Sequence, residues 1–380
     1  MKTLVLGGYG NFGARICRAL AGDSRIELLI AGRDLRRAEM LAAAIGGKAR
    51  GVAIDLDNVD FSAELRRLGV EILIHTAGPF QRQGYHVAEA AAASGAHYID
   101  LSDGRRFVCD FPAALDAAFR TAGRTAVCGA STVPALSSAV VGHLTAGWQR
   151  IDAIDICIAP AQTAPRGHAT LAAVLSYCGE PVPVWTGGAW RTLRGWVGLQ
   201  RIDFARFRPR LGALCDIPDL EIFPARYRVT QRVMFRAALE VGLAQRVFAL
   251  LACLRAARLL PRLTLFAGLL NATARALDFM GTALGGMVVR VEGLDAAGRP
   301  SRRAWHIAAD DDHGPEIPCM AAILLARHLA HELAAVSAGA FTAAGLLTLD
   351  DFVPEFARWG MVTDTLDEPL HGAAPREKKS

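Results

Sequence analysis

Three glycines near the start of the chain stand at the spacing Gly8-x-Gly10-x-x-Gly13. They follow a short apolar run, residues 3–6, and precede a segment with helical periodicity, which places them in the turn between a strand and a helix. Such a turn binds the pyrophosphate of a dinucleotide, because the helix N-terminus is partly positive. We expect Gly8 to allow the tight turn, Gly10 to admit the phosphates and Gly13 to let helix and strand pack closely. The same predicted binding turn includes Tyr9, Asn11 and Phe12. The alternative is a glycine-rich turn without a ligand.

The end of the second predicted strand indicates which dinucleotide this turn would bind. NAD sites usually have Asp or Glu about 20 residues after the glycine motif, where the carboxylate bonds the ribose 2′-hydroxyl. This chain has Arg33 there instead. A guanidinium pairs with a 2′-phosphate through two parallel charged hydrogen bonds, so we predict NADP(H) as the cofactor. The alternative is that Arg33 is a solvated loop residue and that Asp34 binds the ribose.

The elements that position these residues alternate regularly over the first 130 residues. We predict strands at 3–6, 26–31, 51–55, 71–75, 97–100 and 125–128, with helices at 35–45, 84–94 and 112–122 among the connections. Strands separated by helices form parallel sheets. The sequence therefore predicts an α/β fold with a doubly wound, Rossmann-type parallel sheet.

The carboxyl ends of parallel strands meet at one edge of the sheet, where ligands of such folds bind. This edge would gather residues 76–79, 100–103 and 129–131 beside the glycine turn. Ordinary alternatives are a turn at Gly78-Pro79 and a helix-capping role for Asp55 and Asp100. The predicted cofactor contacts at these strand ends are Asp55, Ala77, Gly78, Pro79 and Ser131.

After residue 130 the pattern changes, which predicts an inserted second α+β domain at 131–314. Mixed-face strands are expected at 151–158, 191–196 and 228–235, and residues 287–293 and 302–308 flank a hairpin turn at 295–299. An Ala/Leu-rich helix at 315–335 is expected to return and pack on the domain formed by residues 1–130. The end of the chain, 365–380, combines Gly, Pro and charge, and we expect a flexible tail.

Residues 236–285 are rich in Leu, Ala and Phe and are punctuated by arginines. Their longest uncharged run, 263–274, has 12 residues and is too short to span a bilayer. Pro261 is expected to divide the segment into two helices, and Arg255, Arg258 and Arg262 would share one helical face if Pro261 only kinks the helix. Two interpretations stay open: a helical hairpin buried against the sheet or a second subunit, or helices lying in a membrane interface.

Composition limits the class of protein. The chain has 380 residues, 52% of them hydrophobic, which is enough for two domains with a large core. A net charge of +5 without a basic tract interleaved with aromatics argues against a nucleic-acid partner. The eight cysteines contain no C-x-x-C pair, so neither a metal site nor a disulfide framework is expected. Since the first strand begins at once, we expect no signal peptide and a cytoplasmic location, either free or peripheral at the inner membrane.

Four segments resemble the NADP-binding domain of saccharopine dehydrogenase-like proteins: residues 7–13, 31–33, 77–80 and 95–103. The Gly78-Pro79-Phe80 element is similar to the branch that holds saccharopine dehydrogenase-like oxidoreductases and trans-acting enoyl reductases. Residues 129–137 are similar to that branch's G-x-D-S-x-P-S-D element, although Ala130 replaces its Asp. The resemblance covers about residues 1–140. It implies a nicotinamide-dinucleotide domain with an inserted substrate domain, but not a particular substrate.

The sequence offers few general acids. Its lysines are Lys2, Lys48, Lys378 and Lys379, and no tyrosine has a lysine four residues later, which excludes a Tyr-x-x-x-Lys pair. The proton donor must then be His, Tyr, Asp, Glu or Cys. We predict His168, at the start of a helix in the second domain, as the catalytic residue. Further candidates are His75, His97, Tyr98 and His313.

Two classes of function remain open from the sequence. The first is an NADP(H)-dependent oxidoreductase that moves a hydride to or from a C=C, C=N or C=O group of a small molecule. The second is a non-catalytic NADPH-binding or membrane-interface protein that serves as a scaffold or sensor. A homo-oligomer is compatible with both.

Overall fold

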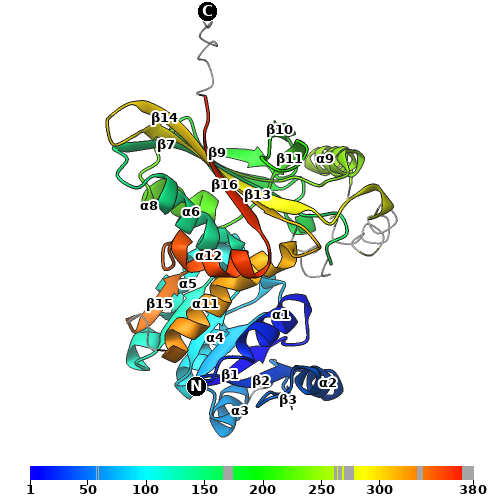
Figure 1. Cartoon of the computed structure of the whole chain (residues 1–380), viewed down its shortest axis with the longest axis vertical. Coiled ribbons are helices and arrows are strands. Elements are labelled where there is room, and N and C mark those ends of the chain that lie inside the picture. Colours follow the sequence, from blue (N-terminus) through cyan, green and yellow to red (C-terminus); the bar gives the residue numbers. More distant parts are fainter. Residues whose placement is uncertain are drawn as a thin grey trace, which may run out of the picture.

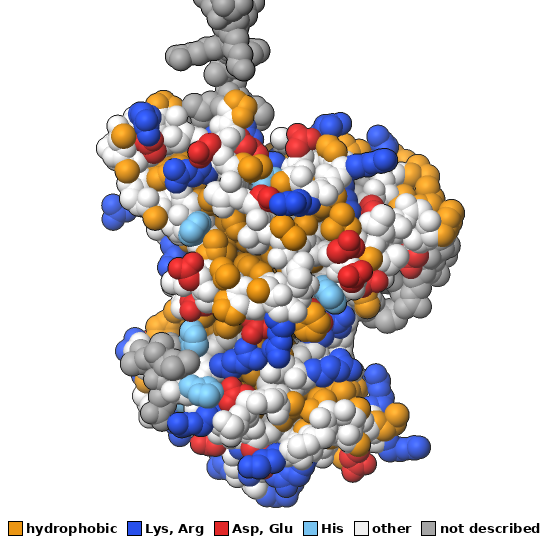
Figure 2. Space-filling model, viewed as in Figure 1, with side chains coloured by type: hydrophobic (Ala, Val, Ile, Leu, Met, Phe, Trp, Pro, Cys, Tyr) orange, Lys and Arg blue, Asp and Glu red, His pale blue; other side chains and the backbone are white. Residues whose placement is uncertain are grey.

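The computed structural model describes residues 1–56, 58, 60–165, 174–260, 263, 268, 278–331 and 337–369. These residues form two β-sheets, which lie at opposite ends of the molecule in Figure 1 with helices between and around them. In space-filling form the surface narrows between the two ends (Figure 2).

The first sheet contains seven parallel strands in the order β15-β6-β5-β4-β1-β2-β3. The strands are β1 Lys2–Leu6, β2 Glu27–Gly32, β3 Arg50–Ala53, β4 Ile72–His75, β5 His97–Asp100, β6 Thr125–Cys128 and β15 Gly339–Thr342. Helices cover both faces, which is why the inner strands are almost continuously apolar and buried. The predicted Rossmann-type sheet is thus confirmed, including its first six strands.

The helices of this domain are α1 Asn11–Leu20, α2 Leu35–Ile45, α3 Phe61–Leu68, α4 His86–Ser94 and α5 Arg105–Thr121. The sequence analysis did not predict α3. It also placed the start of α5 at Pro112, whereas the helix begins seven residues earlier and has the proline inside it. Proline is favoured in a first helical turn, so the residue was a misleading start signal here.

The C-terminal part of the chain completes this domain. Helix α11, Ile317–His331, packs on α1, where Arg327 donates a hydrogen bond to the Ala19 carbonyl at 3.0 Å. After it, β15 pairs with β6 as a seventh strand that the sequence analysis did not predict. Segments far apart in the sequence therefore share one sheet.

The second sheet is mixed, with β12 and β7 parallel and its other neighbours antiparallel. Its main path is β10-β11-β12-β7-β13-β14-β16, and β8 and β9 branch from β12. The strands are β7 Arg150–Ala159, β8 Pro181–Thr186, β9 Ala189–Arg194, β10 Gln200–Ile202, β11 Arg210–Leu214, β12 Arg232–Ala237, β13 Gly285–Leu294, β14 Pro300–Ala309 and β16 Val362–Asp367. The expected hairpin is β13–β14.

Strand β16 corrects the predicted boundary of the tail. A flexible tail was expected from residue 365, but the chain stays paired with β14 as far as Asp367. Ion pairs hold this edge strand: Arg206 with Asp364 at 2.7 Å and Arg303 with Asp367 at 3.1 Å. The rest of the predicted tail, from 370, lies outside the described residues.

Three helices fill the space between the two sheets: α6 Ser137–Leu144, α8 Asp219–Arg226 and α12 Leu349–Arg358 (Figure 1). One buried apolar cluster extends through them, from Val5 and Ile30 of the first sheet to Val289 and Trp305 of the second. The two sheets are therefore joined by a common core.

The apolar segment at 236–285 is described only in part. Helix α9, Gly242–Ala256, exposes Leu243 (61%), Val247 (44%) and Leu250 (59%), and hydrophobic side chains gather at this edge of the molecule (Figure 2). Arg255 pairs with Glu180 at 2.6 Å. Pro261 and Arg262 lie outside the described residues, so the two-helix arrangement stays a prediction. None of the helices in the described part of the chain is both long enough and apolar enough to cross a membrane.

Candidate active site

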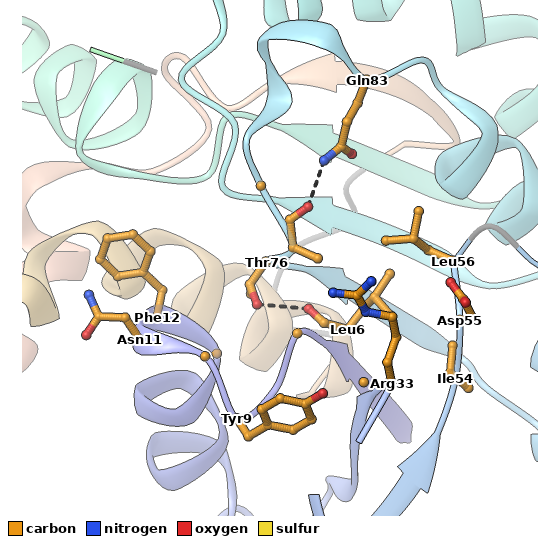
Figure 3. A pocket seen from close by; sticks show the side chains of 16 residues that line it. Leu6, Tyr9, Asn11, Phe12, Arg33, Ile54, Asp55, Leu56, Thr76 and Gln83 are labelled. Carbon is orange, nitrogen blue, oxygen red and sulfur yellow. Dashed lines mark hydrogen bonds between the residues drawn. The ribbon is translucent and has the colours of Figure 1, made fainter. Parts of the chain in front are cut away.

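A cavity of about 450 Å³ opens at the carboxyl edge of the first sheet, between the β1–α1 turn and the ends of β2, β3 and β4 (Figure 3). The predicted site residues that line it are Tyr9, Gly10, Asn11, Phe12, Gly13, Arg33, Asp55, Ala77 and Gly78. Three predicted residues are absent from the lining: Gly8, Pro79 and Ser131. Thr76 also lines the cavity, as expected for residues 76–79, and the lining residues that the sequence analysis missed are Leu6, Gly7, Gly32, Ile54, Leu56 and Gln83. Most of these residues are next to a predicted site residue in the sequence, so the positions of the strand ends were the signal that could have found them.

The glycines of the turn have separable roles. The positive φ of 78° falls on Gly7, so the tight turn is there rather than at Gly8. A Cβ on Gly8 would lie 2.9 Å from Ile30, which shows that Gly8 serves close packing on β2. A Cβ on Gly13 would lie 2.3 Å from the Gly7 carbonyl oxygen, in agreement with its expected role. Gly10 lines the cavity, and a Cβ there would meet only the Gly7 oxygen, at 3.0 Å.

The N-terminus of α1 faces the same space. Gly10 is its N-cap, and among the described residues no side chain caps the helix and no carboxylate lies in its first turn. Arg15 holds Asn11 through its carbonyl (2.9 Å) and side-chain oxygen (2.8 Å), and Glu316 of the returning chain pairs with Arg15 at 2.8 Å. The backbone N–H groups of the first turn are thus left to bind an anion, which fits a pyrophosphate.

Basic side chains gather at the end of β2. In Figure 3 the Arg33 guanidinium points into the cavity, with Thr76 and Asp55 on either side of it in this view. Asp34 does not line the cavity. Its carboxylate accepts from the Arg37 backbone N–H at 3.1 Å and caps α2. Among the described residues no ion pair joins Arg33, Arg36 or Arg37 to a carboxylate, and of these three arginines Arg33 lines the cavity.

Tyr9 connects the glycine turn to this basic end. Its hydroxyl accepts a hydrogen bond from the Asp34 backbone N–H at 3.0 Å. The Arg37 guanidinium carbon lies 4.6 Å from the centre of the Tyr9 ring, in a cation–π contact. A Cβ on Gly32 would collide with the ring, so the Arg33 strand end requires a glycine before it.

The opposite end of the cavity is built by the loop after β4. Gln83 lines the cavity and donates to the Ala77 carbonyl at 2.7 Å. Two residues earlier, in the 3-10 helix η1 (Phe80–Arg82), Gln81 donates to Asp103 Oδ1 at 3.0 Å. Asp103 is partly exposed, yet its burial among protein groups raises the pKa of the carboxyl above its ordinary value.

Beneath these loops lies a sealed polar network. His75 Nδ1 and the Tyr98 hydroxyl are 3.1 Å apart, and Asp100 accepts hydrogen bonds from the backbone N–H groups of Ser102 and Gly129 at 2.9 and 2.8 Å. His75, Tyr98 and Asp100 are at most 1% exposed. Burial lowers the pKa of His75 to about 3 and raises that of Asp100 to about 6. This network fixes the strand ends and has no access to a ligand.

The other candidate acids lie elsewhere. His97 accepts from the Thr125 backbone N–H at the amino end of β5, the edge opposite the cavity, and burial lowers its pKa to about 4. His313 contacts the Trp359 carbonyl at 3.1 Å. His168, the predicted catalytic residue, lies outside the described residues, so its role stays a prediction.

Arg105, the first residue of α5, joins the first domain to the second domain near this end of the cavity. Its side chain is 6% exposed and binds Glu221 (2.8 Å), Asp216 (3.1 Å) and the Pro183 carbonyl (2.7 Å). All three partners belong to the second domain. Arg105 therefore holds the loop that carries Asp103 against that domain.

Comparison with known proteins bears on the first domain and on the overall fold. Residues 3–127 match the family described as the saccharopine dehydrogenase NADP binding domain. Apo saccharopine dehydrogenase (L-Glu forming) from Saccharomyces cerevisiae is similar in structure, with a TM-score of 0.71 and 12% identity over 97% of this chain and 100% of that one. An engineered D-amino acid dehydrogenase bound to NADP⁺ gives a TM-score of 0.48 and 15% identity, covering 93% of this chain and 98% of that one. No curated protein matches the sequence. At 12% identity, the structural likeness to the yeast enzyme establishes the shared fold.

Proposed function

Residues 3–127 of this chain belong to the saccharopine dehydrogenase NADP-binding domain family, and from that premise we propose that the protein is an NADP(H)-dependent oxidoreductase. It would move a hydride to or from a C=C, C=N or C=O group of a small molecule. One observation carries the proposal: an uncapped helix N-terminus and the guanidinium of Arg33 face the same cavity of about 450 Å³. That combination suits a ligand with both a pyrophosphate and a further phosphate.

The chain's own residues divide the work of holding the cofactor. The N-terminus of α1, with Gly10, would bind the pyrophosphate, and Arg33 the 2′-phosphate. Asp55 would contact the adenosine half, while Ala77, Gly78, Pro79 and Ser131 would border the nicotinamide half, since they follow β4 and β6. When bound, the nicotinamide supplies or accepts the hydride. The protein orients the substrate beside it and supplies the proton, for which His168 is the candidate from sequence.

The second candidate function, a non-catalytic NADPH-binding scaffold at a membrane or protein surface, is favoured by a separate observation. Leu243, Val247 and Leu250 form an exposed apolar stripe on α9, with the i, i+4, i+7 spacing of one helical face. Such a stripe suits contact with lipid or with another chain more than it suits catalysis.

Two measurements separate these proposals. NADPH and NADH are titrated against the purified protein by fluorescence, and we expect tighter binding of NADPH. NADPH oxidation is then followed in the presence of fractionated metabolite extracts. An oxidoreductase responds to at least one fraction, whereas binding without any oxidation supports the scaffold. Failure to bind either nucleotide would overturn both.

A further inference from the structure

Reduction of a C=N or C=O group needs a proton as well as a hydride, and the described residues leave few sources of that proton. Lys2 begins β1 and Lys48 precedes β3, so both lie at the amino edge of the sheet, away from the cavity. His75 and Tyr98 are sealed beneath the loops, and His97 is at the wrong edge. Tyr9 and Asp55 line the cavity, but they lie at the end that contains Arg33. An acid beside the other end would come from the loops at the carboxyl ends of β4 and β5.

Two aspartates stand three residues apart in the β5–α5 region, and the structure separates them. Asp100 is fully buried, and its Oδ1 accepts two backbone N–H groups. Asp103 is partly exposed and accepts its hydrogen bond from the side chain of Gln81. Asp100 therefore holds the loop together, whereas Asp103 can exchange a proton with a ligand or solvent.

The position of Asp103 places it toward the nicotinamide half of the site. In a doubly wound sheet, the strands on the β4–β5–β6 side of the switch point border that half. Gln81, the partner of Asp103, is two residues from Gln83, which lines the cavity. Gly104, next to Asp103, lies close to the same segment, since a Cβ there would be 3.5 Å from the Gln81 backbone nitrogen. Asp103 does not itself line the cavity, but it contacts the segment that carries Gln83 into the cavity wall.

We propose that Asp103 is the catalytic carboxyl that exchanges a proton with the substrate beside the nicotinamide; this inference rests on the proposed function. In the reducing direction the substrate carbon of C=O or C=N gains a hydride, and NADPH becomes NADP⁺. The oxygen or nitrogen gains the proton of Asp103, which is left as a carboxylate and regains a proton from solvent. The sum is one NADPH and one proton consumed for each double bond reduced.

The groups around Asp103 agree with this role. Gln81 stabilises the carboxylate through its hydrogen bond, while burial favours the neutral acid, so neither form is locked. Tyr177 of the second domain is a titratable neighbour of Asp103, and Asp100 and Arg105 lie along its own loop. Burial raises the pKa of Tyr177 well above its usual range, with smaller contributions from Cys215 and Asp103. Arg105 is already engaged by Asp216 and Glu221 and leaves Asp103 to the ligand.

The proposal is tested without knowing the substrate, by using the charge of the nicotinamide ring. NADP⁺ has a cationic ring, whereas tetrahydro-NADP has a neutral ring that survives acid. A nearby carboxylate favours the cation, so the affinity for NADP⁺ relative to tetrahydro-NADP should rise with pH as Asp103 ionises. The 2′-phosphate is common to both ligands and cancels in this ratio. Lowering the pKa of Asp103 by one unit on NADP⁺ binding corresponds to about a tenfold rise in the ratio.

Calorimetric titrations of the full chain from about pH 4 to about pH 8, a range that includes ordinary carboxyl pKa values and those raised by burial, decide the question. We expect the ratio to rise with pH in the wild type and in Asp110→Asn, a matched loss of charge on the exposed side of α5. In Asp103→Asn, which still accepts from Gln81, the ratio should be flat. A flat ratio in the wild type, or an unchanged rise in Asp103→Asn, would overturn the proposal. If the ratio stops rising with pH only in His168→Asn, the proton-exchanging residue is His168 and not Asp103.

A second variant keeps the proposal testable if Asp103→Asn does not fold. Gln81→Leu removes the hydrogen bond that favours the carboxylate, so the pKa of Asp103 should rise and the midpoint of the ratio curve should move to higher pH. An unmoved midpoint would contradict the assignment. Failure of the wild type to bind either ligand would instead refute the proposed function, which keeps the two conclusions distinct.

Discussion

The two ends of the cavity are built from very different lengths of chain. The end at Arg33 is made by one βαβ unit, in which Tyr9, Gly32 and Arg37 all lie within about 30 residues of sequence. The opposite end, here called the Asp103 end, is formed by the loop after β4. The neighbouring loop, which carries Asp103, is held by second-domain residues more than 100 positions away. The proposed cofactor selection thus depends on local sequence, whereas the proposed placement of an acid depends on the whole fold.

The largest effect is expected at the junction of the two ends. Gly10→Val puts a branched side chain where the pyrophosphate would lie, and because a Cβ there meets only one protein atom, the fold should survive. NADPH binding should fall at least about a hundredfold, or about 2.7 kcal/mol. Calorimetry measures the affinity and circular dichroism the fold. Gly22→Val is the control, since a Cβ at Gly22 meets nothing within 4 Å. Wild-type affinity in Gly10→Val would refute the predicted pyrophosphate site.

Arg105→Ala should loosen the end at Asp103 and spare the end at Arg33. Removing one member of a buried ion pair costs about 3–5 kcal/mol, but Asp216 and Glu221 are about a third exposed and can rehydrate, so we expect about 2 kcal/mol. Urea unfolding measures the loss of stability. The preference for NADPH over NADH should not change. Arg106→Ala, at an exposed neighbour, should have a much smaller effect; equal losses would mean that Arg105 does not join the domains.

A smaller effect is expected from Arg37, which would reinforce Arg33 from its place on the Tyr9 ring. Arg37→Ala removes one exposed cation beside the proposed 2′-phosphate, so NADPH should bind about fivefold more weakly, close to 1 kcal/mol, and NADH should be unaffected. Arg36→Ala, one residue away on the helix, is the matched control. If both variants lower the affinity for NADPH equally, Arg37 acts only through its charge and its position on the Tyr9 ring does not matter.

The stripe on α9 should leave the cavity untouched. Replacing Leu243, Val247 and Leu250 by serine should not change NADPH affinity, because the stripe lies on an exposed face of the second domain. Flotation with anionic liposomes and light scattering in detergent-free buffer measure contact with lipid and with a second copy. A wild-type protein that is monomeric and ignores liposomes would rule out both kinds of contact.

Sequence patterns predicted the Arg33 end because its determinants are local. The glycine spacing, the apolar strands and the arginine after β2 each report on neighbours a few residues away. Even here, neighbouring glycines were confused: the positive φ falls on Gly7 and not on Gly8, since the motif fixes the turn but not which residue reverses the chain.

Sequence patterns could not predict the arrangement at the Asp103 end. Nothing in the types or spacing of Asp100 and Asp103 tells which one is sealed, because this depends on Gly129 and Gln81, which reach them from other loops. Strand β15 was missed for a related reason: its four residues form a strand only by pairing with β6, more than 200 residues earlier. Tertiary contacts of this kind leave no local periodicity to detect.

The central claim, that this cavity selects a 2′-phosphorylated dinucleotide through one local strand end, is tested most directly by Arg33→Ala. Calorimetric titration with NADPH and NADH gives both affinities under identical conditions. The structure predicts that NADPH affinity falls by about 1.5–3 kcal/mol, the range for hydrogen bonds to charged groups, while NADH affinity is nearly unchanged. An equal loss for both nucleotides would contradict the claim.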